Sequence, residues 1–280
     1  MVRKAAITLA VALSAVLAVA ATIDKRIKFG EAAKQGEFPS IIRIHYNTTS
    51  VLCGGSLLDN TTVLTAAHCW FEGLRTHHSE IVSVRAGSLN KNTGGEVAKV
   101  KSIKVHPEYK PHWNRNDIAI LKLSTPIQES GTIKYANLPA TVLDPVAASV
   151  VVAAGWMTRA ASTVVAAGWG MTENNILPDK LLKVVLFILD PTACLEDGED
   201  DPEYTNYLDT KVCAGYAGKD TSVGDSGGPL FDYNTTELIG VTSFGGLSPL
   251  GGFYTKISRY MTWINENLGD VKSLPSGVAG

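Results

Sequence analysis

Apolar and β-branched residues gather in short runs along most of the chain, and turn residues separate these runs. The runs cover residues 41–46, 51–58, 62–65, 81–86, 97–105, 118–123, 181–189, 238–244 and 252–257. Runs of this length, bounded by Gly, Pro, Asn, Asp and Ser, are typical of strands in a β-sandwich or β-barrel. The pattern therefore predicts an all-β fold.

One stretch near the C-terminus has helical periodicity instead. Apolar residues recur there at i, i+4, i+7 and i+11, namely at Ile257, Met261, Ile264 and Leu268. Ser258 stands where an N-cap is expected, and Gly269 stands where a helix is expected to end. We expect a C-terminal helix, followed by a flexible tail over residues 271–280 that contains Pro and Gly.

The first twenty residues have the pattern of an export signal. Arg3 and Lys4 precede an apolar run over residues 5–20, which ends in the small residues Ala18-Val19-Ala20. A membrane anchor is the competing interpretation, but a spanning helix needs about 20 apolar residues and this run is shorter. We expect residues 1–20 to be a signal peptide and the protein to be secreted and extracellular, without a membrane association.

Export changes the interpretation of the four cysteines, which are Cys53, Cys69, Cys194 and Cys213. An even number of cysteines in an exported chain favours disulfides, here two, and the count alone leaves three pairings open. A zinc site is less favoured because the chain has no close Cys-x-x-Cys pair.

Composition and charge exclude one class of partner and indicate possible glycosylation sites. The 280 residues carry a formal net charge of −2 and no basic run suited to phosphates, so no nucleic-acid partner is expected. Three Asn-x-Thr triplets, at Asn47, Asn60 and Asn234, are acceptor sequences for N-glycosylation in an exported protein. Such triplets also arise by chance.

Three short motifs carry the candidate chemistry. His68 lies in Thr-Ala-Ala-His-Cys, Asp117 lies in Asn-Asp-Ile-Ala-Ile-Leu, and Ser226 lies in Gly-Asp-Ser-Gly-Gly-Pro. Taken singly, each has an ordinary interpretation as a packed histidine, a strand-capping Asp and a tight turn. Taken together and in this order, from Ile27 to about Leu268, they resemble the trypsin/chymotrypsin family of serine proteases.

The resemblance implies a fold and a reaction. The fold is two antiparallel six-stranded β-barrels with a C-terminal helix, forming a protease domain over residues 27–270. This family is the one on which the Ser-His-Asp mechanism is established: Ser226 attacks, His68 transfers the proton, and Asp117 orients the imidazole. The backbone N–H groups of Gly224 and Ser226 form the oxyanion hole. No metal and no organic cofactor is implied.

The family's activation chemistry also has a counterpart here. A propeptide over residues 21–26 ends in Lys25-Arg26, which is either a processing site or an ordinary surface pair. Cleavage after Arg26 frees the ammonium of Ile27, and the resemblance implies that it pairs with Asp225. The motif Ile-Lys-Phe-Gly at 27–30 departs from the family's Ile-Val-Gly-Gly at its second and third positions. We expect the uncut chain to be a zymogen.

The resemblance further assigns a specificity pocket. Asp220, six residues before Ser226, matches the carboxylate that selects Arg or Lys before the cut bond, although it can also be read as a solvated loop residue. Gly245 and Gly252 match the glycines of the pocket wall, and Ser243 begins the segment that pairs with substrate backbone.

The chain departs from the family pattern in two features, its cysteines and a repeated segment. The family's pairings imply the disulfides Cys53–Cys69 and Cys194–Cys213, while a third family disulfide beside the pocket is absent and Ser222 stands at one of its positions. Residues 147–156 and 160–169 are nearly identical copies of one strand. Only the second keeps Gly-Trp-Gly, so we expect it in the barrel. The first is then an extruded loop, a competing strand register or an error in the gene sequence.

The main rival to a peptidase is an inactive secreted homologue that binds a partner protein or acts as an inhibitor module. Such proteins usually lose a triad residue, and here all three are present. We therefore expect a monomeric endopeptidase. Its expected partners are protein or peptide substrates and protein protease inhibitors.

Overall fold

The computed structural model describes residues 30–46, 50–70, 79–139, 149–153, 156–160, 162–195, 208–216, 219–245 and 250–268. The expected signal peptide, the propeptide and the tail at 271–280 all lie outside the described residues.

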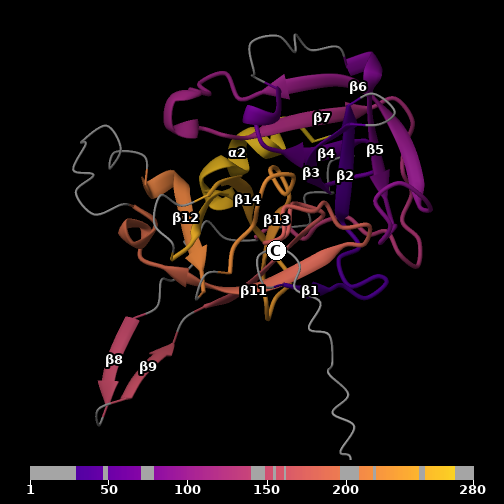
Figure 1. Cartoon of the computed structure of the whole chain (residues 1–280). Coiled ribbons are helices and arrows are strands. Elements are labelled where there is room, and N and C mark those ends of the chain that lie inside the picture. Colours follow the sequence, from indigo (N-terminus) through magenta and orange to yellow (C-terminus); the bar gives the residue numbers. More distant parts are fainter. Residues whose placement is uncertain are drawn as a thin grey trace, which may run out of the picture.

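The first half of the chain folds into a closed barrel, drawn in indigo and magenta in Figure 1. Its strands are β2 (Ile41–Tyr46), β3 (Ser50–Leu57), β4 (Thr62–Thr65), β5 (Val82–Ala86), β6 (Glu96–Val105) and β7 (Ala119–Leu123). They pair in the order β2-β3-β4-β7-β6-β5, and the ring closes because β2 also pairs with β5. Alternate residues of β5 are buried, as the period of a strand requires when one face meets a core.

The second half forms another barrel, drawn from red to yellow, to which the indigo strand β1 from the start of the chain is added. Its strands are β1 (Glu31–Ala32), β10 (Thr163–Gly168), β11 (Leu182–Leu189), β12 (Lys211–Gly215), β13 (Pro229–Asp232), β14 (Leu238–Phe244) and β15 (Gly252–Lys256). Six of them close into a ring because β11 pairs with both β10 and β12, and β1 is added at the edge of β11. The predicted fold of two six-stranded antiparallel barrels is confirmed.

Short 3₁₀ turns connect the strands: η1 (His68–Trp70), η2 (Ser79–Ile81), η3 (His112–Asn114), η4 (Pro191–Cys194) and η5 (Leu208–Thr210). Two disulfides, Cys53–Cys69 and Cys194–Cys213, join the cysteines as the resemblance implied.

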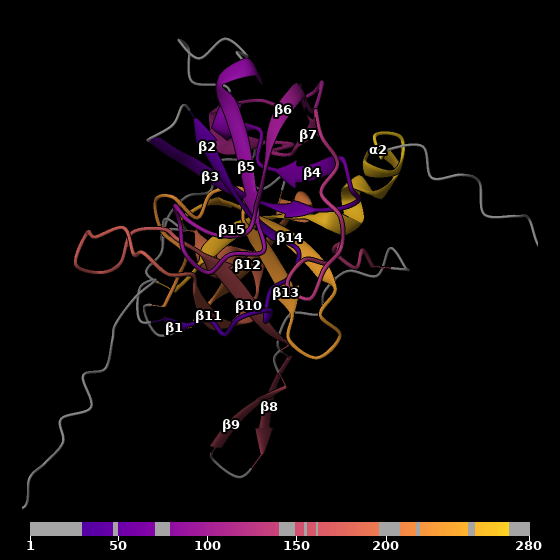
Figure 2. The same cartoon turned by 90° about the vertical axis from the view of Figure 1, so that its right-hand side faces the viewer.

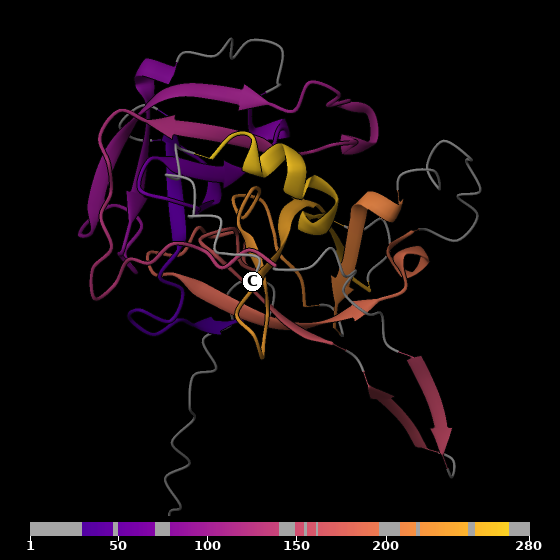
Figure 3. The ribbon, with the colours of Figure 1, turned by 180° about the vertical axis from the view of Figure 1, so that it is seen from behind.

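The C-terminal helix is present, but it is shorter than its apolar stripe suggests. A 3₁₀ turn, η6 (Ile257–Tyr260), precedes a single α-helical segment, α2 (Met261–Asn265). The prediction that Ser258 is the N-cap is wrong: because the first turn is 3₁₀, Tyr260 takes that position, without a side-chain cap. The stripe itself is correct, since Ile257 and Ile264 are fully buried against the first barrel. Figure 3 shows this yellow segment beside the magenta strands.

The repeated segment separates into two different structures. The second copy supplies β10, which lies between β11 and β13 in the second barrel. The first copy supplies β8 (Ser149–Ala153), which pairs with β9 (Trp156–Ala160) in a separate two-stranded sheet. This sheet projects away from both barrels (Figures 1 and 2). The expectation that the second copy belongs to the barrel is confirmed.

In the described part of the chain, no helix has the length and apolar character needed to cross a bilayer.

Candidate active site

His68 and Asp117 are in direct contact, although 49 residues separate them in sequence. His68 lies in η1, directly after β4, and Asp117 lies just before β7, which pairs with β4. The Nδ1 of His68 is 2.8 Å from Oδ2 of Asp117, and the backbone N–H of His68 donates to Oδ1 at 2.8 Å. A carboxylate can only accept, so the shared proton resides on Nδ1 and leaves Nε2 of the imidazole as an acceptor.

Asp117 is a fully buried carboxylate held by several donors. Besides the two bonds from His68, the Ser243 hydroxyl donates to its Oδ2 at 2.5 Å, and the Thr255 hydroxyl donates to its carbonyl at 2.9 Å. Burial alone raises the pKa of Asp117, but His68, Lys211 and the Ser243 hydroxyl outweigh it and hold the pKa below its ordinary value. Asp117 is therefore ionised at neutral pH.

The residue before Asp117 fixes its direction. Asn116 has a φ of 53°, in the left-handed region that Asn tolerates better than most residues. Its side-chain amide donates to the carbonyl of Glu108, and the hydroxyl of Tyr260 donates to its Oδ1 at 2.9 Å. These bonds turn the chain so that Asp117 enters the interior, and the buried Ile118 leads into β7.

Ser226 lies in the turn between β12 and β13, where glycines permit an unusual backbone. Gly224 and Gly227 have φ values of 99° and 78°, and a Cβ on Gly227 would lie 2.2 Å from the hydroxyl oxygen of Thr65. A side chain at Gly227 would thus collide with the first barrel, next to the segment that carries His68.

Backbone hydrogen bonds hold Ser226 between the two barrels. Its carbonyl accepts from the N–H of Gly54 in β3 at 2.8 Å, and the N–H of Gly227 donates to the carbonyl of Thr242 in β14 at 2.8 Å. Gly54 follows Cys53, which is bridged to Cys69 beside His68. Thr242 precedes Ser243, which binds Asp117. Within the described residues, no hydrogen bond joins the Ser226 hydroxyl to His68.

Asp225, next to Ser226, is 1% exposed and is held by backbone donors. The N–H of Gly170 donates to its Oδ1 at 2.6 Å and the N–H of Ser222 to its Oδ2 at 2.9 Å. Burial raises the pKa of Asp225 to about 6; the two backbone donors and Arg43 oppose this, and the charge of Asp220 adds to it. A Cβ on Gly170 would lie 2.2 Å from Oδ2, so only glycine fits there.

Of the predicted pocket residues, Asp220 and Gly252 are in contact. The carboxylate of Asp220 packs on Gly252, where an added Cβ would be 2.8 Å from Oδ1. Asp220 is half-buried and its Oδ1 accepts from the N–H of Thr221 at 2.7 Å. Gly245 is exposed, and an added Cβ there would meet open space. Ser243 is buried at the end of β14.

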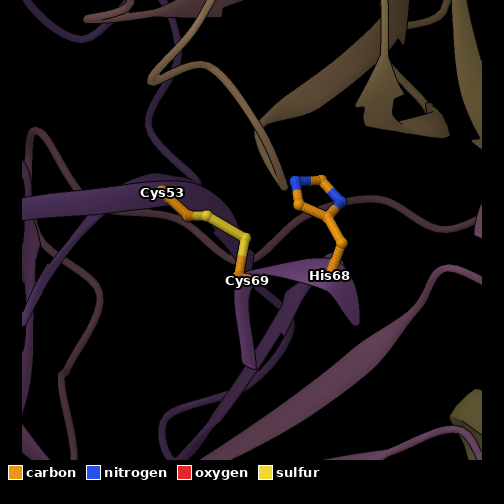
Figure 4. Close-up of side chains that lie close together, drawn as sticks. All are labelled: Cys53, His68 and Cys69. Atoms are coloured by element: carbon orange, nitrogen blue, oxygen red, sulfur yellow. A yellow bond between two sulfur atoms is a disulfide. The ribbon is translucent and has the colours of Figure 1, made fainter. Parts of the chain in front are cut away.

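One group of potential metal ligands also lies at this site, but it does not fit a metal. Cys53, His68 and Cys69 have ligand atoms within 4.8 Å of one another. Figure 4 shows why they cannot act together: the two sulfur atoms are bonded to each other, beside the His68 ring. A metal-binding cysteine must be a thiolate, so the two cysteines are structural and do not offer metal ligands.

The remaining predicted residues are on the surface or outside the described residues. Asn60 is half-buried in a bend, and Asn234 is exposed in the turn after β13. Arg26, Ile27 and Asn47 lie outside the described residues, so their roles remain predictions.

Two buried cations near the site were not found from the sequence. Lys211 is 1% exposed and its ammonium donates to the hydroxyl of Ser243 at 2.9 Å. Arg43, also 1% exposed, places its guanidinium 5.4 Å from the Trp169 ring centroid. The position of Lys211, two residues before Cys213 in a buried strand, was the available signal.

Similarity to known proteins covers most of the chain. Residues 27–264 match the family model described as Trypsin. The chain is 32% identical over 248 residues to Trypsin of Sarcophaga bullata, covering 87% of this chain and 89% of that protein. It is 31% identical over 252 residues to Trypsin delta of Drosophila erecta, covering 88% and 89%. Ovochymase of Halocynthia roretzi is 32% identical over 268 residues, covering 89% of this chain and 16% of that protein. With a family match over 27–264 and relatives above 30% identity along nearly their whole length, this chain belongs to the trypsin family of serine proteases.

Proposed function

We propose that this chain is a secreted serine endopeptidase that cleaves peptide bonds after Arg or Lys, with Ser226, His68 and Asp117 as its catalytic triad. The observation that carries the proposal is the bonded pair of His68 and Asp117, with the Ser226 turn fixed beside it by hydrogen bonds to both barrels. Protein and peptide substrates follow from membership of the family.

The geometry supports a separate role for each triad residue. With its proton on Nδ1, His68 presents Nε2 as the base that accepts the proton of Ser226 during attack on the substrate carbonyl. The buried carboxylate of Asp117 stabilises the imidazolium that forms. His68 then returns the proton to the leaving amine, and water repeats the sequence on the acyl-enzyme. The contact between Ser226 and His68 tightens when substrate binds, since such bonds are often long in a free enzyme.

The backbone around Ser226 supports the oxyanion hole at Gly224 and Ser226. The carbonyl of Val223 accepts from Met171 and the carbonyl of Asp225 accepts from Gly228, both at 2.8 Å. The carbonyl and N–H of a trans peptide point to opposite sides. The N–H groups of Gly224 and Ser226 therefore point away from these internal partners, as donors to a developing oxyanion must.

The surroundings of Asp220 support a preference for Arg and Lys. A half-buried carboxylate against Gly252 is poorly solvated, and a cationic substrate side chain would restore the lost interactions. Ser243 and Phe244 end β14, Gly245 follows them, and this segment would offer a strand edge to the substrate backbone. In the same proposal, residues 1–20 are removed on export, cleavage follows Arg26, and the protease domain spans 27–270.

The direct test is Ser226→Ala in the protein cleaved after Arg26. Because Ser226 is the nucleophile, kcat on Arg and Lys peptide substrates should fall by about 10⁶-fold, the scale measured for another serine protease. Labelling by a serine-directed phosphonate should also disappear. The control is Ser124→Ala, which removes an exposed serine of the first barrel and should leave both readouts unchanged.

An inactive homologue gives a different result. In that case the cleaved wild-type chain takes up no phosphonate and hydrolyses no Arg, Lys or Phe substrate, and the proposal fails. A chain that hydrolyses Phe substrates in preference to Arg and Lys contradicts the pocket assignment alone.

A further inference from the structure

A lysine is buried directly behind the Asp117 carboxylate. Lys211 is the first residue of β12, and it is among the largest fully buried side chains of the described structure. Its Nζ donates to the carbonyl of Asn114 at 2.8 Å, to the hydroxyl of Ser243 at 2.9 Å and to the hydroxyl of Thr255 at 3.3 Å. An ammonium has three protons, and each has an oxygen here.

These partners are all neutral, so hydrogen bonds alone do not compensate the buried charge. Burial of an ammonium costs several kcal/mol, and a buried cation is normally matched by an anion. The ring of Phe244, 5.4 Å from Nζ, gives modest help. Burial lowers the pKa of Lys211 to about 8, and the charge of Asp117 opposes that change. Lys211 is therefore a cation at neutral pH, with Asp117 as the anion that balances it.

Ser243 connects the two charges. An ammonium cannot accept, so the Ser243 oxygen accepts from Lys211 and its own proton must be donated elsewhere. That proton goes to Oδ2 of Asp117 at 2.5 Å, the same oxygen that His68 Nδ1 contacts at 2.8 Å. Lys211 thus fixes the direction of a chain of hydrogen bonds that ends at the imidazole.

Lys211 also contacts a second hydroxyl that holds Asp117 in place. The Thr255 hydroxyl, which contacts Lys211, donates its own proton to the carbonyl of Asp117 at 2.9 Å. Lys211 therefore orders both hydroxyls that hold Asp117 from the second barrel, through β14 and β15. A neutral apolar side chain at this position would leave both hydroxyls free to rotate.

We propose that Lys211 is a positioning residue of the catalytic site, which orients Ser243 toward Asp117 and supplies the positive charge that keeps the Asp117–His68 pair close to neutral. The inference rests on the proposed function, because it assigns a part in the same triad. Its physical consequence concerns His68: a fixed cation behind Asp117 opposes the charge of the imidazolium. Loss of Lys211 therefore removes a repulsion that acts on the imidazolium through Ser243 and Asp117.

Tyr260 is a further titratable group whose surroundings include Asp117. Tyr260, from η6, is uncharged at working pH because burial raises its pKa to about 12, with the charges of Asp117 and Asp209 acting in the same direction. Arg115 and Asp209 are exposed and act on Tyr260 from the solvent side. Lys211 is thus the buried cation that faces Asp117 from the second barrel.

The test is the pH profile of kcat/KM for Lys211→Met in the cleaved protein. Methionine is unbranched and fills a similar space, so the main change is loss of the charge and of the donor to Ser243. The interaction between two unit charges separated by two bridging groups in a protein changes the pH at which one of them titrates by about one unit. The acid limb of the profile, which reports protonation of His68, should move to higher pH by that amount.

Two further variants distinguish loss of the charge from loss of the hydrogen bond and from the general effect of replacing a lysine. Lys211→Gln keeps a donor for Ser243 but no charge, so it should show most of the same shift. Lys122→Met removes another lysine that donates to a hydroxyl, that of Thr62 at 2.8 Å, but in the first barrel. Lys122→Met should leave the acid limb in place.

A structural role and a positioning role give different results. If Lys211 only supports folding, Lys211→Met and Lys211→Gln lower the melting temperature while the acid limb stays where it is, and the inference is wrong. The titration of the His68 ring is followed by NMR in the same variants, so the inference is tested even without turnover. An unshifted His68 titration overturns it. Wild-type protein that neither turns over substrate nor takes up phosphonate overturns the proposed function instead.

Should Lys211→Met not fold, Lys211→Gln still decides. An acid limb at the wild-type position contradicts the opposing cation, and an acid limb moved to higher pH agrees with it.

Discussion

Asp220 and Asp225 are close in sequence but differ in environment. Asp225 is buried among backbone donors, whereas Asp220 is half-buried against Gly252 and raises the pKa of Asp225 through its charge. The charge of Asp220 therefore makes Asp225 harder to ionise. If the proposed cationic substrate side chain binds beside Asp220, it opposes this effect and links substrate binding to the state of the Ser226 turn.

Replacement of Asp220 tests the pocket. In Asp220→Ser, an Arg or Lys side chain enters a partly dry site without its counter-charge. Loss of one partner of a buried pair costs about 3–5 kcal/mol, so kcat/KM on Arg and Lys substrates should fall by roughly 10²–10³-fold. Activity on a Phe substrate should not fall. Steady-state kinetics on the three substrates measure both effects.

Asp209→Ser is the matched control, because Asp209 is an exposed carboxylate that pairs with Arg259 at 3.2 Å. It should leave the order of preference unchanged. Intact Arg cleavage in Asp220→Ser would mean that another group binds the cation.

Sequence reasoning identified the residues that carry motifs and missed the buried cations. His68, Asp117 and Ser226 stand in long, rare strings, so each could be named without coordinates. Lys and Arg are almost never fully buried, and a pattern of polar and apolar residues assigns them to the surface. Arg43 and Lys211 go against that rule, and only tertiary packing shows that each is enclosed.

At the scale of elements, the apolar runs predicted the long strands and missed several short ones, among them β12 and β13. β11 alternates buried and half-buried residues along its length, so its signal is strong. β12 begins with Lys211 and ends in Gly215, and β13 begins with Pro229. Such residues are depleted in strands, and here packing between neighbouring strands overrides propensity.

The repeat shows how one glycine selects between two similar strands. The copies have the same length and nearly the same sequence, so strand propensity cannot choose between them. After Trp169 comes Gly170, whose N–H binds Asp225 and whose missing Cβ leaves room for that carboxylate. The first copy has Met157 at the corresponding place, which would collide with Asp225.

Two deletions of equal length test this account. Removal of residues 147–159 deletes the first copy, and β8 and β9 pair only with each other. The free energy of unfolding and the activity should therefore stay close to wild type. Removal of residues 160–172 leaves the first copy to form the barrel strand, with Met157 at the place of Gly170. That chain should be less stable by several kcal/mol, as expected for overpacking against a buried carboxylate, and inactive.

Denaturant unfolding and peptide hydrolysis compare the two deletions. Equal stability of the two variants would mean that Gly170 does not decide which copy enters the sheet.

At the scale of the whole molecule, the site exists only where the barrels meet. The first barrel supplies His68 and Asp117, the second supplies Ser226 and Ser243, and the bonds from Gly54 and Thr255 cross between them. The resemblance implies the same division, with His68 and Asp117 in the first barrel and Ser226 in the second. It could not predict the state of Asp225, because that depends on which charges are buried around it.

The pH dependence of stability should differ between the uncut and the cleaved chain. In the uncut chain, the pKa of Asp225 is about 6, above the ordinary 3.8, because the carboxylate is buried. A raised carboxyl pKa means that the protonated form favours folding. The contribution of Asp225 is then complete below pH 3.8 and is lost as the pH rises through 6. The difference is about 3 kcal/mol, at 1.36 kcal/mol for each pKa unit.

Cleavage after Arg26 should reverse this dependence. The ammonium of Ile27 would pair with Asp225 and lower its pKa, so the contribution of the pair would appear as the pH rises above 3.8 and persist to neutral pH.

Unfolding free energies from pH 4 to 8 measure the effect in a Ser226→Ala background, which prevents self-digestion. An uncut Arg26→Gln chain is compared with the cleaved chain. Asp225→Asn in the uncut chain removes the titrating group and should flatten the difference between pH 4 and 7. Parallel pH curves for the cut and uncut chains would show that Ile27 does not reach Asp225, and that Arg43 remains the main positive charge facing that carboxylate.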